Sequence, residues 1–167
     1  MSGAAAGRKN WLETLSLAAR WLLGGLFIYM GASKAPHPEA FLKLVRQYQL
    51  TDDYFLLNTV ASTLPWFEVF CGILLICGVA VRGVALVLTV ILAAFTWVVW
   101  RRALTLEAAR AIPFCAVKFD CGCGNGEVFI CHKLAENFGL LALSVWLMLG
   151  QGRGWSLRYA LRPAPES

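Results

Sequence analysis

No charged residue lies between Arg82 and Arg101, and the segment from Val84 to Trp100 consists mainly of apolar side chains. At about 1.5 Å of rise per residue, a helix of this length crosses most of the apolar interior of a bilayer. Three other apolar segments have a similar character, and the four predicted spans cover about residues 11–33, 55–81, 84–100 and 134–150. The sequence therefore predicts an all-α integral membrane protein, a four-helix bundle.

The composition agrees with this fold class. Of the 167 residues, 59% are apolar, and the mean hydropathy is +0.63, which lies above the range of ordinary soluble proteins. The net charge is +5, but the basic residues stand at the ends of the apolar segments and in the loops and form no basic run. Membrane lipid is therefore an expected partner, and nucleic acid is not.

The connections between the predicted spans differ in length. Pro36 and Pro38 end the first span, and a short amphipathic helix containing Phe41 is expected to follow in the membrane interface. The dipeptide Arg82-Gly83 is expected to form a tight turn between the second and third spans. A long extramembrane loop, residues 103–133, joins the third span to the fourth.

Two polar tails are predicted outside the transmembrane domain of residues 11–150. Residues 1–10 form a disordered basic tail, and residues 151–167 form a basic tail that contains prolines. Four spans place both tails on one side of the membrane and the long loop on the other. Because the basic residues near the tails have almost no acidic neighbours and clustered cysteines suit an oxidising compartment, we expect a plasma (inner) membrane protein with cytoplasmic termini and a periplasmic loop.

The long loop carries four cysteines, Cys115, Cys121, Cys123 and Cys131. A disulfide between Cys121 and Cys123 would close a very small ring, so it should be strained and easily reduced. Such a bond suits a pair that exchanges disulfides with another protein better than one that only holds a loop. We therefore expect Cys121 and Cys123 to be the exchanging pair, with Cys115 or Cys131 as resolving partners.

Two other interpretations of the same residues stay open. In the first, Cys121 and Cys123 form structural disulfides to Cys115 and Cys131. In the second, the four thiols and His132 bind a metal ion, although their spacing matches no standard zinc or iron–sulfur pattern.

Two charged residues, Arg20 and Glu68, are predicted to lie well inside the spans. A charge at such depth is costly unless it is paired or faces a cavity. Because the two residues lie at comparable depth on consecutive, antiparallel helices, we expect an ion pair that joins these helices. A proton-transfer or quinone-headgroup site is the alternative, so a quinone and a metal ion are the cofactors that the sequence leaves open.

Three motifs together resemble a known family. They are Arg20 with residues 27–34 at the end of the first span, Pro65-Trp66-Phe67-Glu68 in the second, and the Cys-Gly-Cys-Gly loop before Glu136-Asn137. They resemble the DoxX-like membrane proteins, and among these the MauE branch, whose members carry Cys-Gly-Cys-Phe-Gly before an Arg-Asn or Glu-Asn. The chain departs from this pattern at Gly124, where the branch usually has Phe, and by its additional Cys115, Cys131 and His132.

The resemblance implies a multi-pass fold of four helices and a function in thiol chemistry. The MauE branch is associated with the maturation of methylamine dehydrogenase, a disulfide-rich periplasmic enzyme. The expected function is thus thiol–disulfide exchange with an exported thioredoxin-like or disulfide-containing partner. The alternative is a non-catalytic accessory subunit of a membrane electron-transfer complex, with other membrane subunits as partners and the cysteine loop held by disulfides or a metal.

Overall fold

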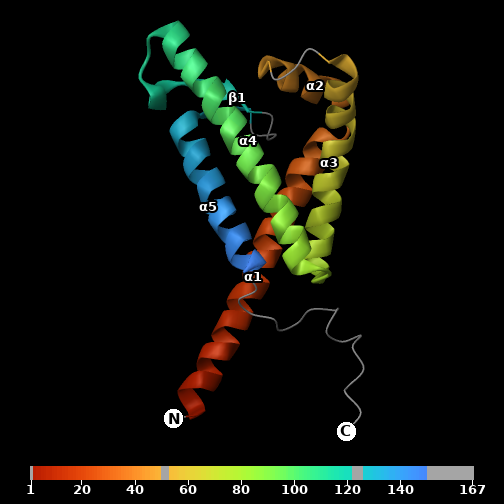
Figure 1. The fold of residues 1–167 in the computed structure, drawn as a ribbon, viewed down its shortest axis with the longest axis vertical. Helices are drawn as coiled ribbons and strands as arrows, with labels where there is room; N and C mark the ends of the chain where they lie inside the picture. Colours follow the sequence, from red (N-terminus) through yellow and green to blue (C-terminus); the bar gives the residue numbers. More distant parts are fainter. Residues whose placement is uncertain (1, 50–52, 122–125, 150–167) are drawn as a thin grey trace.

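The computed structural model describes residues 2–49, 53–121 and 126–149, and it describes only the backbone of residues 2–10. The described part comprises five α-helices, one 3₁₀ helix and two strands: α1 (Ser2–Lys34), α2 (Pro38–Gln47), α3 (Tyr54–Cys77), α4 (Val81–Arg110), η1 (Phe114–Ala116), β1 (Lys118–Asp120), β2 (Glu127–Phe129) and α5 (Ile130–Met148). Figure 1 shows α1, α3, α4 and α5 as the long elements, with α2 and the strands at the end of the molecule opposite the start of α1.

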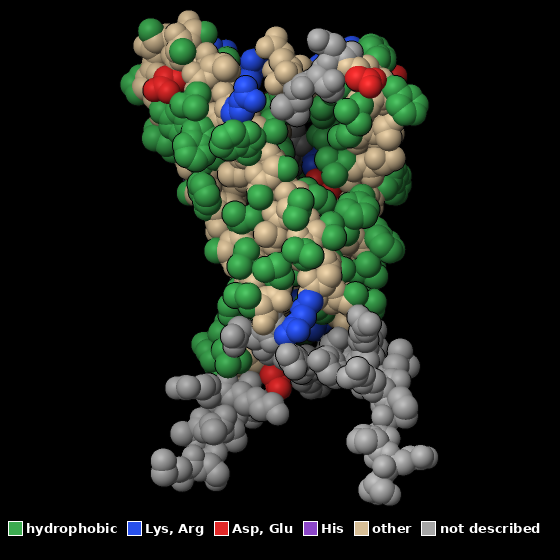
Figure 2. Space-filling model, viewed as in Figure 1, with side chains coloured by type: hydrophobic (Ala, Val, Ile, Leu, Met, Phe, Trp, Pro, Cys, Tyr) green, Lys and Arg blue, Asp and Glu red, His purple; other side chains and the backbone are tan. Residues whose placement is uncertain are grey.

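Three helical segments in the described part of the chain are long and apolar enough to cross a membrane. They are Trp11–Lys34 of α1, Tyr54–Cys77 of α3 and Val81–Arg110 of α4. Large side chains on their outer faces are exposed, among them Trp21, Trp66 and Trp97. Figure 2 shows hydrophobic side chains along the whole body on one face, while charged side chains gather mostly near its two ends. Such a surface fits lipid contact over the middle of the body.

The predicted fourth span is present as a helix, α5, but it falls short of the length and apolarity of the other three. Lys133, Glu136 and Asn137 occupy its first two turns, and these polar side chains lower its mean hydropathy. The helix nevertheless packs along α4, where the hydroxyl oxygens of Thr89 and Ser144 lie 2.9 Å apart. The fold is therefore mostly helical with three candidate spans, and the fourth membrane span stays a prediction.

The ends of α3 follow from two residues with specific backbone roles. Asp53 caps its start, because the carboxylate accepts hydrogen bonds from the N–H groups of Phe55 and Leu56 at 2.9 and 3.3 Å. Gly78 ends the helix in the left-handed conformation with φ +74°, which glycine adopts without steric cost. The prediction of a turn at Arg82-Gly83 is wrong, since these residues lie in the first turn of α4.

Two other boundaries differ from the sequence prediction. Residues 2–10, for which a disordered tail was predicted, continue α1, and three successive alanines there favour a helix. The third span continues to Arg110, so the connection to α5 is shorter than the predicted loop. The short helix predicted after the first span is present as α2, with Pro38 in its first turn and Phe41 buried, and its place in the membrane interface stays a prediction. The tail predicted for residues 151–167 lies outside the described residues.

Glycines allow α1 and α3 to approach closely. A Cβ atom at Gly72 of α3 would lie 2.6 Å from the carbonyl oxygen of Gly24 on α1, and a Cβ atom at Gly24 would lie 2.8 Å from the carbonyl oxygen of Gly72. Farther along α1, a Cβ atom at Gly31 would meet the carbonyl oxygen of Pro65. Small residues at contacts of this kind let membrane helices pack backbone to backbone.

Two hydrophobic clusters fill the interior. The larger one joins the four long helices around Leu23, Leu75 and Leu88, all with an exposed fraction of 0%. The second cluster lies where α4 meets the segment between α4 and α5, and its buried members are Val99, Ala103, Val117, Cys121 and Ile130. The cysteine-containing segment is therefore packed onto the helices.

We predict that Gly72→Ala destabilises the protein by about 1–3 kcal/mol, because the added methyl group has to displace the backbone of α1. Thermal unfolding in detergent measures this change. Gly25→Ala is the matched control on α1: a Cβ atom there meets nothing within 4 Å. An equal loss of stability in both variants would contradict the close approach of the two helices.

Candidate functional site

The cysteine segment forms a short β-hairpin. Strands β1 and β2 pair in antiparallel orientation, with Lys118 opposite Phe129 and Asp120 opposite Glu127. The pairing continues at the base, where the N–H of Ile130 donates to the carbonyl oxygen of Val117 at 3.1 Å. Cys121 directly follows β1 at the far end of the hairpin. Cys123 lies outside the described residues.

A disulfide between Cys115 and Cys131 closes the base of the hairpin. It joins η1 to the first turn of α5, with the two Cα atoms 5.0 Å apart. This pairing contradicts the alternative in which Cys115 and Cys131 bond to Cys121 and Cys123. In the metal alternative, the four loop cysteines and His132 were the donors. The disulfide removes two of these donors, the thiolates of Cys115 and Cys131.

Cys121 is held in place from two sides. Its side chain belongs to the second hydrophobic cluster, and the residue has an exposed fraction of only 2%. The hydroxyl group of Tyr48, which follows α2, donates a hydrogen bond of 3.0 Å to the carbonyl oxygen of Cys121. The ring of Tyr48 also meets the ring of Phe119 edge to face, with centroids 6.4 Å apart. Helix α2 thus fixes the far end of the hairpin.

The disulfide and Cys121 lie at opposite ends of the hairpin. Val117 is next to the base and Cys121 follows the last residue of β1, a distance of about 13 Å for four residues of extended chain. Cys115 and Cys131 are bonded to each other in this structure, whereas the sequence predicted that one of them is the resolving partner of the Cys121–Cys123 pair. They serve as a staple that fixes the hairpin to α5.

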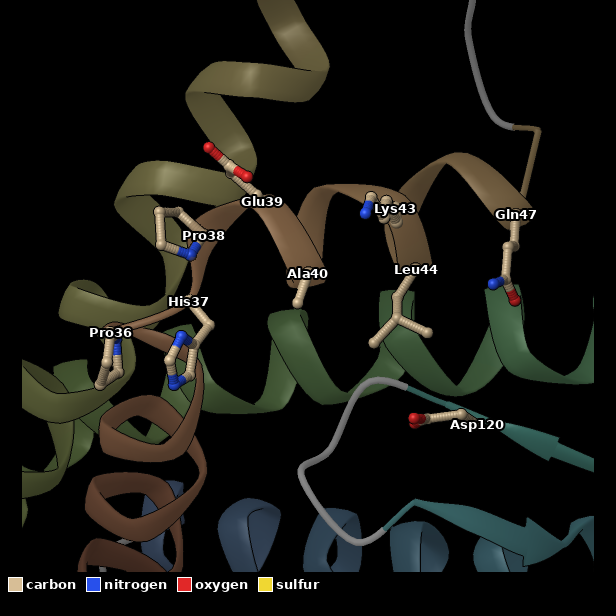
Figure 3. A pocket seen from close by; sticks show the side chains of 9 residues that line it. All are labelled: Pro36, His37, Pro38, Glu39, Ala40, Lys43, Leu44, Gln47 and Asp120. Carbon is tan, nitrogen blue, oxygen red and sulfur yellow. The ribbon is translucent and has the colours of Figure 1, made fainter.

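A groove with a volume of about 640 Å³ lies between α2 and the hairpin. Its walls are one face of α2, the preceding residues Pro36 and His37, and Asp120 of β1. Figure 3 shows Ala40 and Leu44 pointing from α2 toward the hairpin, with Asp120 on the facing side. Asp120, which lines the groove, is the residue that precedes Cys121.

The buried carboxylate of Glu68 has a different partner from the one predicted. Its Oε2 atom lies 2.8 Å from Nζ of Lys34, the last residue of α1, and both side chains are almost fully buried. The ammonium group of Lys34 also lies 5.2 Å from the ring centroid of Phe41 in α2. This ion pair therefore connects α1, α3 and α2.

Arg20 binds backbone carbonyl groups instead of Glu68. Its guanidinium donates to the carbonyl oxygens of Leu75 at 3.1 Å and Ile76 at 3.3 Å. Leu75 lies two helical turns, about 11 Å, beyond Glu68 along α3. The predicted ion pair of Arg20 and Glu68 is wrong, because Arg20 lies beside the C-terminal end of α3, where the helix macrodipole favours a cation.

Polar groups also line the buried face of α5. Nζ of Lys133 lies 3.0 Å from Oε2 of Glu136, and Lys133 has an exposed fraction of 2%. Asn137, one turn farther along, is equally buried, and its Nδ2 atom has no hydrogen-bond partner within the described part of the chain. No cluster of potential metal ligands occurs among the described residues.

The sequence analysis missed two residues that organise the site. The sequence assigned Lys34 no role other than as the last residue of the motif 27–34. A lysine at the end of an apolar helix can nevertheless extend its side chain along the helix surface and reach a buried acid. Tyr48 directly follows α2, and the partner of its hydroxyl group is a main-chain group 73 residues away in sequence. No local signal in the sequence predicts such a contact.

The model of the family described as methylamine utilisation protein MauE matches residues 12–150. Neither a curated protein nor a solved structure matches the chain.

We predict that Lys34→Met and Glu68→Leu each destabilise the protein by about 3 kcal/mol, because each leaves a buried charge without its partner. The double variant should lose much less than the sum of the two, and thermal or denaturant unfolding in detergent measures the difference. Arg20→Leu combined with Glu68→Leu is the matched control, and their effects should add within about 0.5 kcal/mol. Coupling in the control pair but not between Lys34 and Glu68 would contradict the observed pairing.

Proposed function

Because the chain belongs to the MauE family of membrane proteins, we propose that its cysteine hairpin exchanges disulfides with an exported partner protein. The chain is a membrane protein with several apolar helices, which fits a multi-pass accessory protein. We propose in addition that the chemistry is thiol–disulfide exchange, that Cys121 and Cys123 carry it out, and that the hairpin lies on the periplasmic side of the membrane.

The observation that supports the proposal is the difference in environment between the three described loop cysteines, Cys115, Cys131 and Cys121. Cys115 and Cys131 form a disulfide at the base of the hairpin. Cys121 lies at the far end of the hairpin, beside the groove and outside the three candidate spans. A site on rigid elements that is anchored at both ends suits chemistry that requires a fixed sulfur position.

The burial of Cys121 assigns the roles within the Cys121–Cys123 pair. An incoming thiolate cannot reach a sulfur whose residue is 2% exposed, so it attacks the sulfur of Cys123. The Cys121–Cys123 bond breaks, a mixed disulfide forms, and Cys121 leaves as a thiolate that takes up a proton. The second thiol of the partner then attacks the mixed disulfide, and two electrons have passed from the partner to the pair. The reverse sequence reduces the partner, with Cys121 as the resolving thiol.

The family name and the chemistry together suggest the kind of partner. It is an exported protein with a dithiol or disulfide, either thioredoxin-like or an enzyme with many disulfides, and the hairpin faces the periplasm. No metal ion or quinone is needed for a single exchange, because the two electrons pass between two pairs of sulfur atoms.

One observation favours a second candidate function. The Cys115–Cys131 bond already gives the loop a structural disulfide, as expected for a non-catalytic accessory subunit of a membrane electron-transfer complex. In that case the partners are other membrane subunits, and the sulfur of Cys123 exchanges with no exported protein.

We predict that Cys121→Ser traps a mixed disulfide between Cys123 and the exported partner, because the resolving thiol is lost. Cys123→Ser should trap none, since Cys121 is buried. Non-reducing electrophoresis with mass spectrometry of the adduct measures both results. Absence of any adduct in both variants would favour the accessory-subunit function.

Cys115→Ser is the control for a purely structural effect. It should lower the thermal stability, because removal of a native disulfide from a small domain typically costs about 2–5 kcal/mol. It should not trap the partner. An adduct on Cys131 in this variant would reassign the exchanging pair.

We also predict that a membrane-impermeant maleimide labels Cys115 in intact cells after mild reduction, because this residue is exposed and the hairpin faces outward. Quantitative mass spectrometry measures the labelled fraction. Labelling that requires cell lysis would contradict the outward orientation and place the termini on the outer side.

A further inference from the structure

The geometry points to the groove between α2 and the hairpin as the binding site for an extended polypeptide segment of the partner, next to its reacting cysteine. This inference rests on the proposed function and names the surface through which the partner is recognised. The proposed occupant of the groove is a main-chain segment of the partner protein, not a small molecule or a lipid.

The position of the groove supports this occupant. One wall is α2, which lies outside the three candidate spans, so the groove belongs to the end of the molecule and not to the lipid-facing body. The opposite wall contains Asp120, the residue before Cys121. A segment that lies in the groove therefore passes Asp120, the neighbour of Cys121 in sequence, and Figure 3 shows Asp120 across from Leu44 of α2.

The length and the volume of the groove also fit a short extended peptide segment. Helix α2 has 10 residues, which correspond to a length of about 15 Å at 1.5 Å per residue. An extended chain advances about 3.3 Å per residue, so four or five residues fill this length. The volume of about 640 Å³ lies in the usual range of ligand sites.

The chemistry of the walls fits a peptide main chain. Ala40 and Leu44 supply an apolar strip, and the amide of Gln47 on the same face can both donate and accept a hydrogen bond. Lys43 and His37 are basic, whereas Glu39 and Asp120 are acidic, so the groove has no single sign of charge. A mixed wall of this kind is unlike the cationic surface that an anionic lipid headgroup or a free phosphate would require.

The two walls are held at a fixed separation at one end. The hydrogen bond from Tyr48 to the carbonyl oxygen of Cys121 connects the end of α2 to the end of β1. The Lys34 ammonium beside Phe41 holds the buried side of the same helix. A groove between elements fixed in this way is formed before the partner binds, which lowers the entropic cost of binding.

The experiment compares two thiol probes on the oxidised full-length protein in detergent micelles. One probe is an uncharged pentapeptide with a central cysteine and blocked ends, and the other is 2-mercaptoethanol. Each thiol attacks the Cys121–Cys123 disulfide, forms a mixed disulfide and releases one protein thiol. The measured quantity is the ratio of the two second-order rate constants, each scaled by the thiolate fraction of its probe.

Ala40→Trp places a large side chain in the groove at an exposed position, and it should lower this ratio about tenfold, the equivalent of 1.4 kcal/mol. Gln47→Ala is a second, milder variant that removes one polar contact and should lower the ratio by a few fold. Ala108→Trp, at an exposed position of α4 outside the groove, is the matched control and should keep the ratio of the unmodified protein.

Three results would overturn parts of this inference separately. Equal ratios in all variants would show that the groove does not bind the peptide, while exchange itself remains. A peptide preference that disappears when phosphatidylglycerol is added to the micelles would assign the groove to a lipid headgroup. No mixed disulfide with either thiol on the unmodified protein would overturn the proposed function itself.

Discussion

The ion pair between Lys34 and Glu68 is the interaction on which the functional end of the molecule depends. A lone charge in the membrane interior is costly, so each residue requires the other. The pair fixes the end of α1 to the middle of α3, and Lys34 at the same time contacts Phe41 of α2. Helix α2 in turn holds Cys121 through Tyr48. The position of Cys121 therefore depends on a pair of buried charges in α1 and α3.

At their other end, α1 and α3 are joined by a charged side chain that binds main-chain groups instead of an acid. Arg20 donates to the carbonyl oxygens of Leu75 and Ile76 in the last turn of α3, where the helix macrodipole favours a cation. Between the two polar contacts, Gly24 and Gly72 bring the backbones together. In a bilayer, association of helices gains little from the hydrophobic effect, so close packing and satisfied polar groups have to supply the stability. The pair α1 and α3 is thus a rigid support for α2.

The hairpin separates two roles that the sequence had combined in one cysteine cluster. The Cys115–Cys131 bond fixes the base of the hairpin to α5, whereas Cys121 lies at the opposite end against α4 and α2. A staple at one end and a hydrogen bond at the other leave the strands little freedom to shift. In the function that we propose, this arrangement fixes the position of Cys121 next to the groove that Asp120 lines.

The sequence by itself determined the three candidate membrane spans and the short helix α2, because a bilayer permits few structures for a long apolar segment and proline marks where such a segment ends. It also contained the motifs of the family. The tertiary structure decided which residues meet. Lys34 pairs with Glu68 because the lysine side chain reaches along α1, while Arg20 lies two turns away. Likewise, several disulfide pairings of the loop cysteines were equally compatible with the sequence, and only the register of the hairpin brings Cys115 next to Cys131.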